Sequence, residues 1–228
     1  MNSQFFDDPE KVAAYEQGPR WFVPAYEASH DMAAVLLQEF VPVSGHILVV
    51  GAGGGIELAA LAKAGAQWRF TGVDPAEPML AMARGRLSGL GMLDRVDLIH
   101  GFASDAPAGP FDAATCFLTL HFVPDDGARL ATLRDIHQRL KPGAPFLLIN
   151  GCLDKSAARF GRDMARYSAF ARFKGAPAEM TVMAATTVAE QVHLLPAARD
   201  EALLAEAGFH SVEPFYRGLW VHGWLAHA

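Results

Sequence analysis

A glycine-rich stretch directly after a buried strand constrains this chain more than any other feature. The sequence HILVVGAGGGIELAAL covers residues 46–61, and glycine or alanine occupies every position from 51 to 55. The apolar run 46–50 predicts a buried strand, and residues 56–65 predict a helix that ends at Gly65. Glycine lets ligand atoms approach the backbone, and the N–H groups at a helix N-terminus point outward. The strand, turn and helix therefore predict a site for an anionic or polar ligand.

Strand-like and helix-like segments alternate along the rest of the chain. Further strands are predicted at 68–74, 96–101, 111–118, 146–150, 211–216 and 219–227, and helices at 24–40, 78–90, 126–140 and 199–207. This alternation predicts an α/β fold, a parallel sheet with right-handed crossovers and helices on both faces. Residues 152–195 interrupt it with a helical insertion, which is either a lid or a plain helix pair. We expect one domain over residues 1–228, with 1–40 as an N-terminal helical cap.

Composition and charge narrow the choice of partners. The 228-residue chain has a net charge of −6 and a pI near 5.8 without clustered cations, which argues against nucleic acid. No uninterrupted apolar run approaches the roughly 18 residues of a membrane span. The first residues are acidic where a secretory leader is basic, and Cys116 and Cys152 lack CxxC or zinc spacing. We therefore expect a cytoplasmic protein with reduced thiols, no membrane association and no metal.

The spacing of the glycines discriminates between two kinds of nucleotide site. A dinucleotide fingerprint GxGxxG needs glycines at 51, 53 and 56, but position 56 is Ile56. The observed GxGxG form, with Asp74 twenty-three residues after Gly51, suits an adenosine that carries an amino-acid tail. A carboxylate at that strand end can accept hydrogen bonds from both ribose hydroxyls. The alternative is that the glycines only form a tight turn and Asp74 only caps the following helix.

Beyond these patterns, the chain resembles the class I S-adenosylmethionine-dependent methyltransferases. The resemblance covers about residues 20–228 and is carried by LVVGAGGG (48–55), FTGVDPAEPML (70–80), HGFASDAPAGPFDAATCFLTLHFV (100–123) and LKPGAPFLLI (140–149). Three further segments are similar to the branch that contains carboxy-S-adenosylmethionine synthase: FVPAYEA (22–28), FLTLHFVPDD (117–126) and LLAEAGFHSVE (203–213). The resemblance implies a Rossmann-like, seven-stranded, mostly parallel sheet whose last strand inserts antiparallel. It also implies S-adenosylmethionine as the cofactor, over the carboxyl ends of the first four strands.

The resemblance also implies which residues bind the cofactor. Gly51, Ala52 and Gly53 would pass beneath its methionine part, and Asp74 would bind the ribose diol. The other implied contacts are Pro75 and Met79 beside the adenine, Phe102 and Ala103 against the adenine, Phe117 and Leu118 on the floor, and Tyr26 over the methionine end. For Met79, Leu118 and Tyr26 the alternative is ordinary packing.

Departures from the family pattern bear on the cofactor. Many relatives have an acid where this chain has Val49, and a second acid against the adenine where it has Phe102. Losing a charge-assisted hydrogen bond costs roughly 1.5–3 kcal/mol, and stacking on Phe102 offsets roughly 0.5–1.5 kcal/mol, so we expect modest cofactor affinity. Carboxy-S-adenosylmethionine synthase also needs an arginine shortly before residue 190, but residues 180–192 contain no basic residue. Because an unpaired buried carboxylate is very costly, we reject carboxylate transfer and expect ordinary S-adenosylmethionine.

The expected chemistry is in-line methyl transfer to the oxygen or nitrogen of a small-molecule acceptor, which depends mainly on proximity. A general base helps where the acceptor is a hydroxyl or a protonated amine. His121 is the candidate because it follows the fourth strand, and its alternative is a packed or solvent-facing histidine. The methionines and aromatic residues of 164–173 and 179–188 suit an apolar acceptor or a homodimer interface. A non-catalytic cofactor-binding or dimeric scaffold, or a relative of tRNA-modification enzymes, stays open as an alternative.

Overall fold

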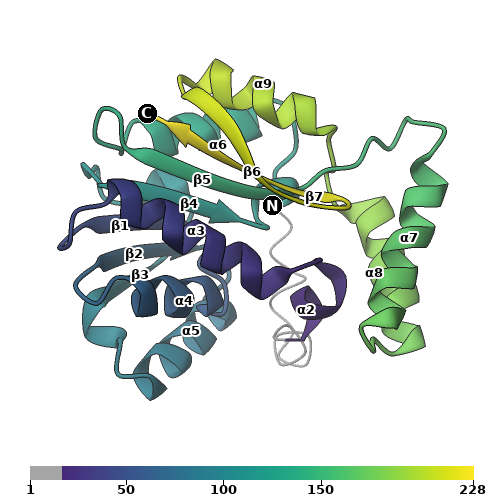
Figure 1. Cartoon of the computed structure of the whole chain (residues 1–228), viewed down its shortest axis with the longest axis horizontal. Coiled ribbons are helices and arrows are strands. Elements are labelled where there is room, and N and C mark those ends of the chain that lie inside the picture. The colour runs from purple at the N-terminus through teal and green to yellow at the C-terminus, as the bar shows by residue number, and fades with distance from the viewer. Residues whose placement is uncertain (1–16) are drawn as a thin grey trace.

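A seven-stranded sheet forms the body of the protein. The computed structural model describes residues 17–228, and its strands lie in the order β3-β2-β1-β4-β5-β7-β6 (Figure 1). The strands are β1 His46–Val50, β2 Arg69–Asp74, β3 Val96–His100, β4 Ala113–Phe117, β5 Pro145–Gly151, β6 His210–Gly218 and β7 Val221–His227. The helices are α2 Gly18–Phe22, α3 Tyr26–Phe40, α4 Ile56–Ala64, α5 Glu77–Gly89, α6 Ala128–His137, α7 Phe160–Phe173, α8 Ala178–Gln191 and α9 Ala197–Ala207. Residues 1–16 of the expected N-terminal cap lie outside the described residues.

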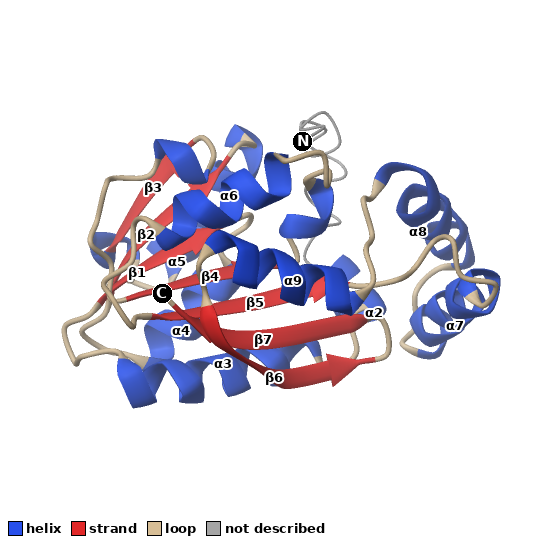
Figure 2. Cartoon of the chain, turned by 90° about the horizontal axis from the view of Figure 1, so that it is seen from above, coloured by secondary structure: helices blue, strands red, loops and turns tan. Residues whose placement is uncertain are grey.

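The first five strands are parallel, which confirms the α/β prediction. Helices α3, α4 and α5 pack on one face of the sheet, and α6 and α9 pack on the other (Figure 2). Strands β4 and β5 are buried along their whole length. They read as continuous apolar runs rather than as alternating ones, because both faces of the sheet are covered.

The strand order reverses between β1 and β4, which pair side by side. One crossover after β1 leads toward β2 and β3, and the chain then returns to place β4 on the other side of β1. Open α/β sheets bind ligands outside the carboxyl ends of their strands at such a reversal, so the loops after β1 and β4 are the expected place for a site.

The last two strands complete the sheet, and of the described strands β7 alone runs against the others. Strand β7 runs antiparallel to both β5 and β6 and lies between them, as the resemblance implied. The β6–β7 turn is tight, and Leu219 within it has a φ of 57°. The predicted Rossmann-like, seven-stranded, mostly parallel sheet is thus confirmed.

The predicted helical insertion after the fifth strand is also present. It forms the helices α7 and α8, which stand at the end of the molecule away from β3 (Figures 1 and 2). Tyr167 of α7 stacks on Phe22 of α2, with ring centroids 4.9 Å apart, and contacts Trp220 edge-on at 5.0 Å. The insertion is therefore joined to the N-terminal cap and to the β6–β7 turn by aromatic packing. Among the described residues, no helix combines the length and apolarity needed to cross a membrane.

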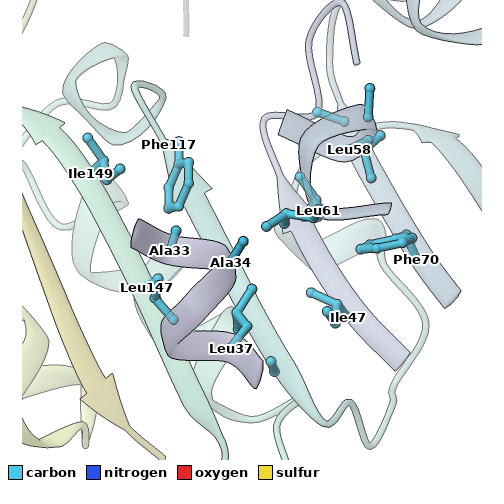
Figure 3. Close-up of a cluster of buried hydrophobic side chains, with 14 of the residues drawn as sticks. Ala33, Ala34, Leu37, Ile47, Leu58, Leu61, Phe70, Phe117, Leu147 and Ile149 are labelled. Atoms are coloured by element: carbon cyan, nitrogen blue, oxygen red, sulfur yellow. The ribbon is translucent and has the colours of Figure 1, made fainter. Parts of the chain in front are cut away.

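The larger hydrophobic core lies between the sheet and helices α3 and α4. Figure 3 shows Ala33, Ala34 and Leu37 of α3 facing side chains of β4 and β5, and Leu58 and Leu61 of α4 beside side chains of β1 and β2. Small residues on α3 let the helix approach the sheet closely, and each fully buried leucine contributes roughly 1.5–3 kcal/mol. This packing fixes the ends of β1 and β4, which border the pocket described below.

Candidate functional site

The glycine loop between β1 and α4 is held tightly against the neighbouring strands. Gly51 and Gly53 have φ angles of 79° and 48°, a region that favours glycine. The N–H of Gly51 donates to the carbonyl of Val73 in β2 at 2.9 Å. A Cβ added at Gly51 would lie 1.9 Å from the Thr119 hydroxyl oxygen. The predicted glycine turn is therefore real, and the close packing against the loop after β4 leaves no room for a side chain at position 51.

Asp74, at the end of β2, joins this loop to the next crossover. One carboxylate oxygen accepts the N–H of Gly53 at 2.8 Å, and the other accepts the N–H of Ala76 at 2.9 Å. Burial raises the pKa of Asp74, and these two backbone donors oppose the rise. Because each carboxylate oxygen can accept a second hydrogen bond, Asp74 retains acceptor capacity toward a diol. Asp74 thus binds the turn before α5 but is not the N-cap of that helix, which is Ala76, and its predicted role toward the ribose stays a prediction.

A small pocket, lined mainly by apolar atoms and partly open to solvent, lies beside the glycine loop. We call it the strand-end pocket because the ends of β1, β2, β3 and β4 surround it. Its lining residues are Val50, Gly51, Val73, Pro75, Gly101, Phe102, Ala103, Cys116, Thr119, Leu120, Val123 and Thr132. The structure thus brings Gly51, Pro75, Phe102 and Ala103 together, as predicted. Thr119, Val123 and Thr132 were missed, because their place on the wall depends on how the loop after β4 and helix α6 pack.

On the β3 side of the pocket lies Phe102, at the position where the resemblance implies an acid. Phe102 is 52% exposed, so its ring is available at the pocket mouth. Its backbone N–H donates to Asp105 at 2.7 Å, and Ala103 beside it is buried. Since Asp105 already binds the backbone of this turn, a flat apolar ring is what the turn presents to a ligand.

Four of the other predicted contacts lie outside the lining of this pocket. Tyr26 and Phe117 are each 6% exposed, and both contact the His30 ring edge-on. Met79 is buried in a small cluster with Ala76 and Met82. Leu118 has a φ of 53°, and its N–H donates to the Ile149 carbonyl at 2.7 Å. Their predicted roles toward a cofactor stay predictions.

Sequence reasoning missed Glu57, in the first turn of α4. This carboxyl is buried, and its Oε1 has no hydrogen-bond partner among the described residues. Burial raises the pKa of Glu57 to about 8, and the Thr115 hydroxyl opposes this rise. Thr115 is the register partner of Val49, the position where many relatives have an acid. The sequence signal for Glu57 was a single acid in a helix whose other buried residues are apolar.

His121 lies at the end of a buried polar chain that we call the His121 network. The network consists of His121, Asn150, Asp200 and Arg129, which come from the loop after β4, from β5, from α9 and from α6. His121 Nδ1 lies 2.9 Å from Asn150 Oδ1, Asn150 Nδ2 donates to Asp200 at 2.8 Å, and Arg129 pairs with Asp200 at 3.0 Å. Burial, followed by the charge of Arg129, lowers the pKa of His121 to about 4, against the opposing hydrogen bond from Asn150. The sequence indicated His121 but not its partners.

The arrangement fits an adenosine cofactor with an amino-acid tail. The loop presents backbone at Gly51 to Gly53, Asp74 offers acceptor oxygens beside it, and the strand-end pocket offers an apolar surface next to the loop. Among the described residues, no group of three or more His, Cys, Asp or Glu side chains lies close enough to hold a metal ion.

Comparison with known proteins agrees with this fold. Residues 47–143, which include the glycine loop, Asp74 and β4, match the methyltransferase domain family. The chain thus shares a methyltransferase-domain segment with that family and, over the whole sheet, the fold of solved S-adenosylmethionine-dependent methyltransferases.

Curated relatives come from two groups. The chain is 34% identical over 142 residues to the ubiquinone biosynthesis O-methyltransferase of Xylella fastidiosa, covering 59% of this chain and 54% of that protein. It is 27% identical over 228 residues to the carboxy-S-adenosyl-L-methionine synthase of Wolinella succinogenes, covering 97% of this chain and 92% of that protein. The alignment with the O-methyltransferase thus spans about half the length of that relative.

Solved structures share the fold over nearly the whole chain. A SAM-dependent methyltransferase from Aquifex aeolicus superposes with a TM-score of 0.65 at 20% identity, covering 96% of this chain and 98% of that one. Human N-acetylserotonin methyltransferase in complex with SAM superposes with a TM-score of 0.66 at 17% identity. The superposition covers 98% of this chain and 57% of that one. At these identities the likeness concerns the fold.

Proposed function

We propose that the protein transfers the methyl group of S-adenosylmethionine to an oxygen of a small-molecule acceptor. The observation that carries the proposal is the glycine loop, with Asp74 bonded to Gly53, next to the strand-end pocket. In this assignment the loop runs beneath the methionine part of the cofactor and Asp74 binds the ribose diol. Phe102 and Pro75 contact the adenine. A hydroxyl acceptor is supported by the relatives that are named as O-methyltransferases.

When bound, S-adenosylmethionine would supply a methyl group on a positively charged sulfur, with S-adenosylhomocysteine as the leaving group. The protein's own contribution is to align the acceptor and to take its proton. His121 is the group we assign to proton removal, since its pKa of about 4 leaves the imidazole neutral at pH 7. An oxygen that has gained a methyl group is strongly acidic while it keeps its proton, so a weak base is sufficient. Alignment then supplies most of the acceleration.

Ordinary methyl transfer, rather than carboxylate transfer, is part of this proposal. Helix α8 spans the segment in which carboxy-S-adenosylmethionine synthase needs its arginine, and it contains no basic residue. The cation beside it, Lys155, donates to the Ala189 carbonyl at 2.6 Å. Helix α8 itself would therefore offer no cation to a carboxylate on the transferred group.

Thermal denaturation with separate ligands tests the cofactor. S-adenosylmethionine and S-adenosylhomocysteine should each raise the melting temperature, and NAD should not. The bound ligand should increase the free energy of unfolding by RT ln(1 + [L]/Kd). Asp74→Asn should remove the shift, whereas the matched change Asp126→Asn on the exposed loop before α6 should keep it. A shift with NAD alone would overturn the assignment.

Methyl transfer itself is tested with radiolabelled S-adenosylmethionine, a panel of catechols and simple phenols, and metabolite extracts, with products identified by mass. We expect label on oxygen, and a loss of about 10²–10⁴-fold in turnover for His121→Gln. Cofactor binding without any labelled product would favour the non-catalytic scaffold. Label only on added tRNA would favour the tRNA-modifying alternative, which the net charge of −6 disfavours.

We further propose a homodimer and a cytoplasmic location. Phe173, Val182 and Met183 of the α7–α8 insertion are between 63% and 86% exposed, which suits a surface covered by a second copy. Both cysteines are buried and unpaired, in keeping with a reducing compartment. Light scattering after size exclusion tests the first proposal, because Met183→Glu should convert a dimer into a monomer. A wild-type monomer would refute it.

A further inference from the structure

Asn150 has only one orientation that satisfies its neighbours. Its Oδ1 accepts the backbone N–H of His121 at 3.0 Å, and its Nδ2 donates to the Asp200 carboxylate at 2.8 Å. A backbone N–H can only donate and a carboxylate oxygen accepts, so exchanging the two amide atoms would break both contacts. Because Asn150 is fully buried, no water replaces the lost partners. The atom that faces the His121 ring is therefore the oxygen.

This orientation determines the tautomer of His121. Asn150 Oδ1 can only accept a hydrogen bond, and it lies 2.9 Å from His121 Nδ1. Nδ1 therefore carries the proton, and Nε2 keeps the lone pair. The Gly151 N–H points at the same Nδ1 from 3.2 Å and favours the opposite tautomer. The Gly151 contact is longer than the Asn150 contact, so we expect the Asn150 side chain to determine which tautomer forms.

The rest of the His121 network keeps Asn150 in place. Asp200 is fully buried and holds both Asn150 and Arg129. Arg129 also donates to the backbone carbonyls of Val123 and His193. It therefore joins the loop after β4 and the end of the insertion to the helix α9. The His193 N–H in turn donates to the His121 carbonyl at 2.9 Å, so the histidine backbone is held as well.

We propose that Asn150, fixed by Asp200, is a positioning residue that keeps His121 protonated on Nδ1. Nε2, which makes no hydrogen bond within the described part of the chain, is then left as the proton acceptor. The role of Nε2 as a base rests on the proposed methyl transfer, whereas the tautomer itself follows from the hydrogen bonds alone. The imidazole would be held in the one tautomer whose Nε2 can accept a proton, and the acceptor hydroxyl would donate its hydrogen bond to Nε2.

The tautomer is measured directly, without cofactor or acceptor. Two-bond ¹H–¹⁵N correlation spectra of the ¹⁵N-histidine-labelled protein at pH 7 distinguish protonated from unprotonated ring nitrogens, and the spectrum of His121→Gln assigns the signal. We expect a protonated Nδ1 and an unprotonated Nε2, the opposite of the form that free histidine prefers. A signal with unprotonated Nδ1, or one averaged between both forms, refutes the inference whether or not the protein transfers methyl groups.

Variants at Asn150 test its role in catalysis. Asn150→Leu has a similar size but no acceptor, and should lose the Nδ1–H signature and lower kcat by tenfold or more on the best phenol of the panel. KM for S-adenosylmethionine should stay within twofold. Asn150→Gln keeps both an acceptor oxygen and a donor amide, and should retain more of the signature and of kcat than the leucine variant. Melting curves confirm that each variant folds, and Asn150→Ser replaces the leucine variant if that one does not. Equal turnover in the leucine variant and wild type would overturn the positioning role.

Discussion

The glycine loop and the His121 network lie at the same end of the sheet but are built in opposite ways. The loop is one contiguous stretch that presents backbone atoms and small side chains, and its single distant acidic partner is Asp74. The network consists of charged and polar side chains from four elements, and its Arg129–Asp200 pair joins residues 71 positions apart. Backbone groups accept a ligand with little reorganisation, whereas a buried polar chain holds one side chain in one state. The first construction suits cofactor binding, and the second suits the control of a base.

The largest effect is expected in the network. Arg129→Met leaves the fully buried Asp200 without its charged partner, which should lower the free energy of unfolding by roughly 3–5 kcal/mol. Urea denaturation measures this loss. The matched change Arg199→Met breaks surface ion pairs with Asp125 and Glu206, and each should cost no more than roughly 1 kcal/mol. Similar losses in the two variants would show that the network contributes no more than a surface pair.

The glycine loop should respond to a single methyl group. Gly51→Ala puts a Cβ 1.9 Å from the Thr119 hydroxyl oxygen at a φ of 79°, so we expect a loss of roughly 2–4 kcal/mol from strain and overpacking. Thermal denaturation reports the loss, and S-adenosylhomocysteine binding should weaken with it. Gly85→Ala, in an open position of α5, should instead stabilise by roughly 0.5–1 kcal/mol. A harmless Gly51→Ala would mean that the loop is looser than its contacts indicate.

Glu57, in the helix that follows the glycine loop, should make the stability of the protein depend on pH. Its pKa is about 8 in the folded protein and near 4.5 when unfolded, so the folded chain holds the proton more tightly. The resulting stabilisation is complete below pH 4.5 and is lost as pH rises toward 8, by up to about 1.4 kcal/mol per pH unit. Glu57→Gln should remove this slope in urea denaturation between pH 5 and 8, whereas Glu179→Gln on exposed α8 should keep it. Identical slopes in wild type and Glu57→Gln would show that the carboxyl is ionised when folded.

The smallest effect is expected at the pocket mouth. Phe102→Ala removes the exposed ring and should weaken S-adenosylhomocysteine binding by roughly 0.5–1.5 kcal/mol, or about two- to tenfold in Kd. Calorimetry measures this difference, and Phe173→Ala at the end of α7 serves as the control. An unchanged Kd would mean that adenine recognition in this chain rests on the pocket walls instead.

Much of the fold was predictable because its signals are local. The apolar runs of β1, β4 and β5 and the glycine that ends α4 lie within a few residues of the features they specify. Helix α6 is shorter than the stretch 126–140 suggested and begins at Ala128, because Gly127 with a φ of 107° precedes it. The amphipathic pattern extends past both ends of the helix, so pattern alone overestimates its length.

The candidate site was predictable in part. Gly51, Pro75, Phe102 and Ala103 meet at one pocket because each follows the end of a parallel strand, and parallel strands end at the same edge. Asn150 and Asp200 carried no such signal. An asparagine in a strand and an aspartate in the first turn of a helix are common, and their importance appears only where they meet His121.

The order of residues along the chain by itself determined the class of fold, the glycine turn and the acidic strand end, since each depends on neighbours in sequence and on the period of the backbone. Tertiary structure alone decided which nitrogen of His121 carries the proton and why a buried Glu57 stays neutral. Both depend on removing polar groups from water beside particular partners, and the strength of that effect is set by the whole packed surroundings rather than by any short segment.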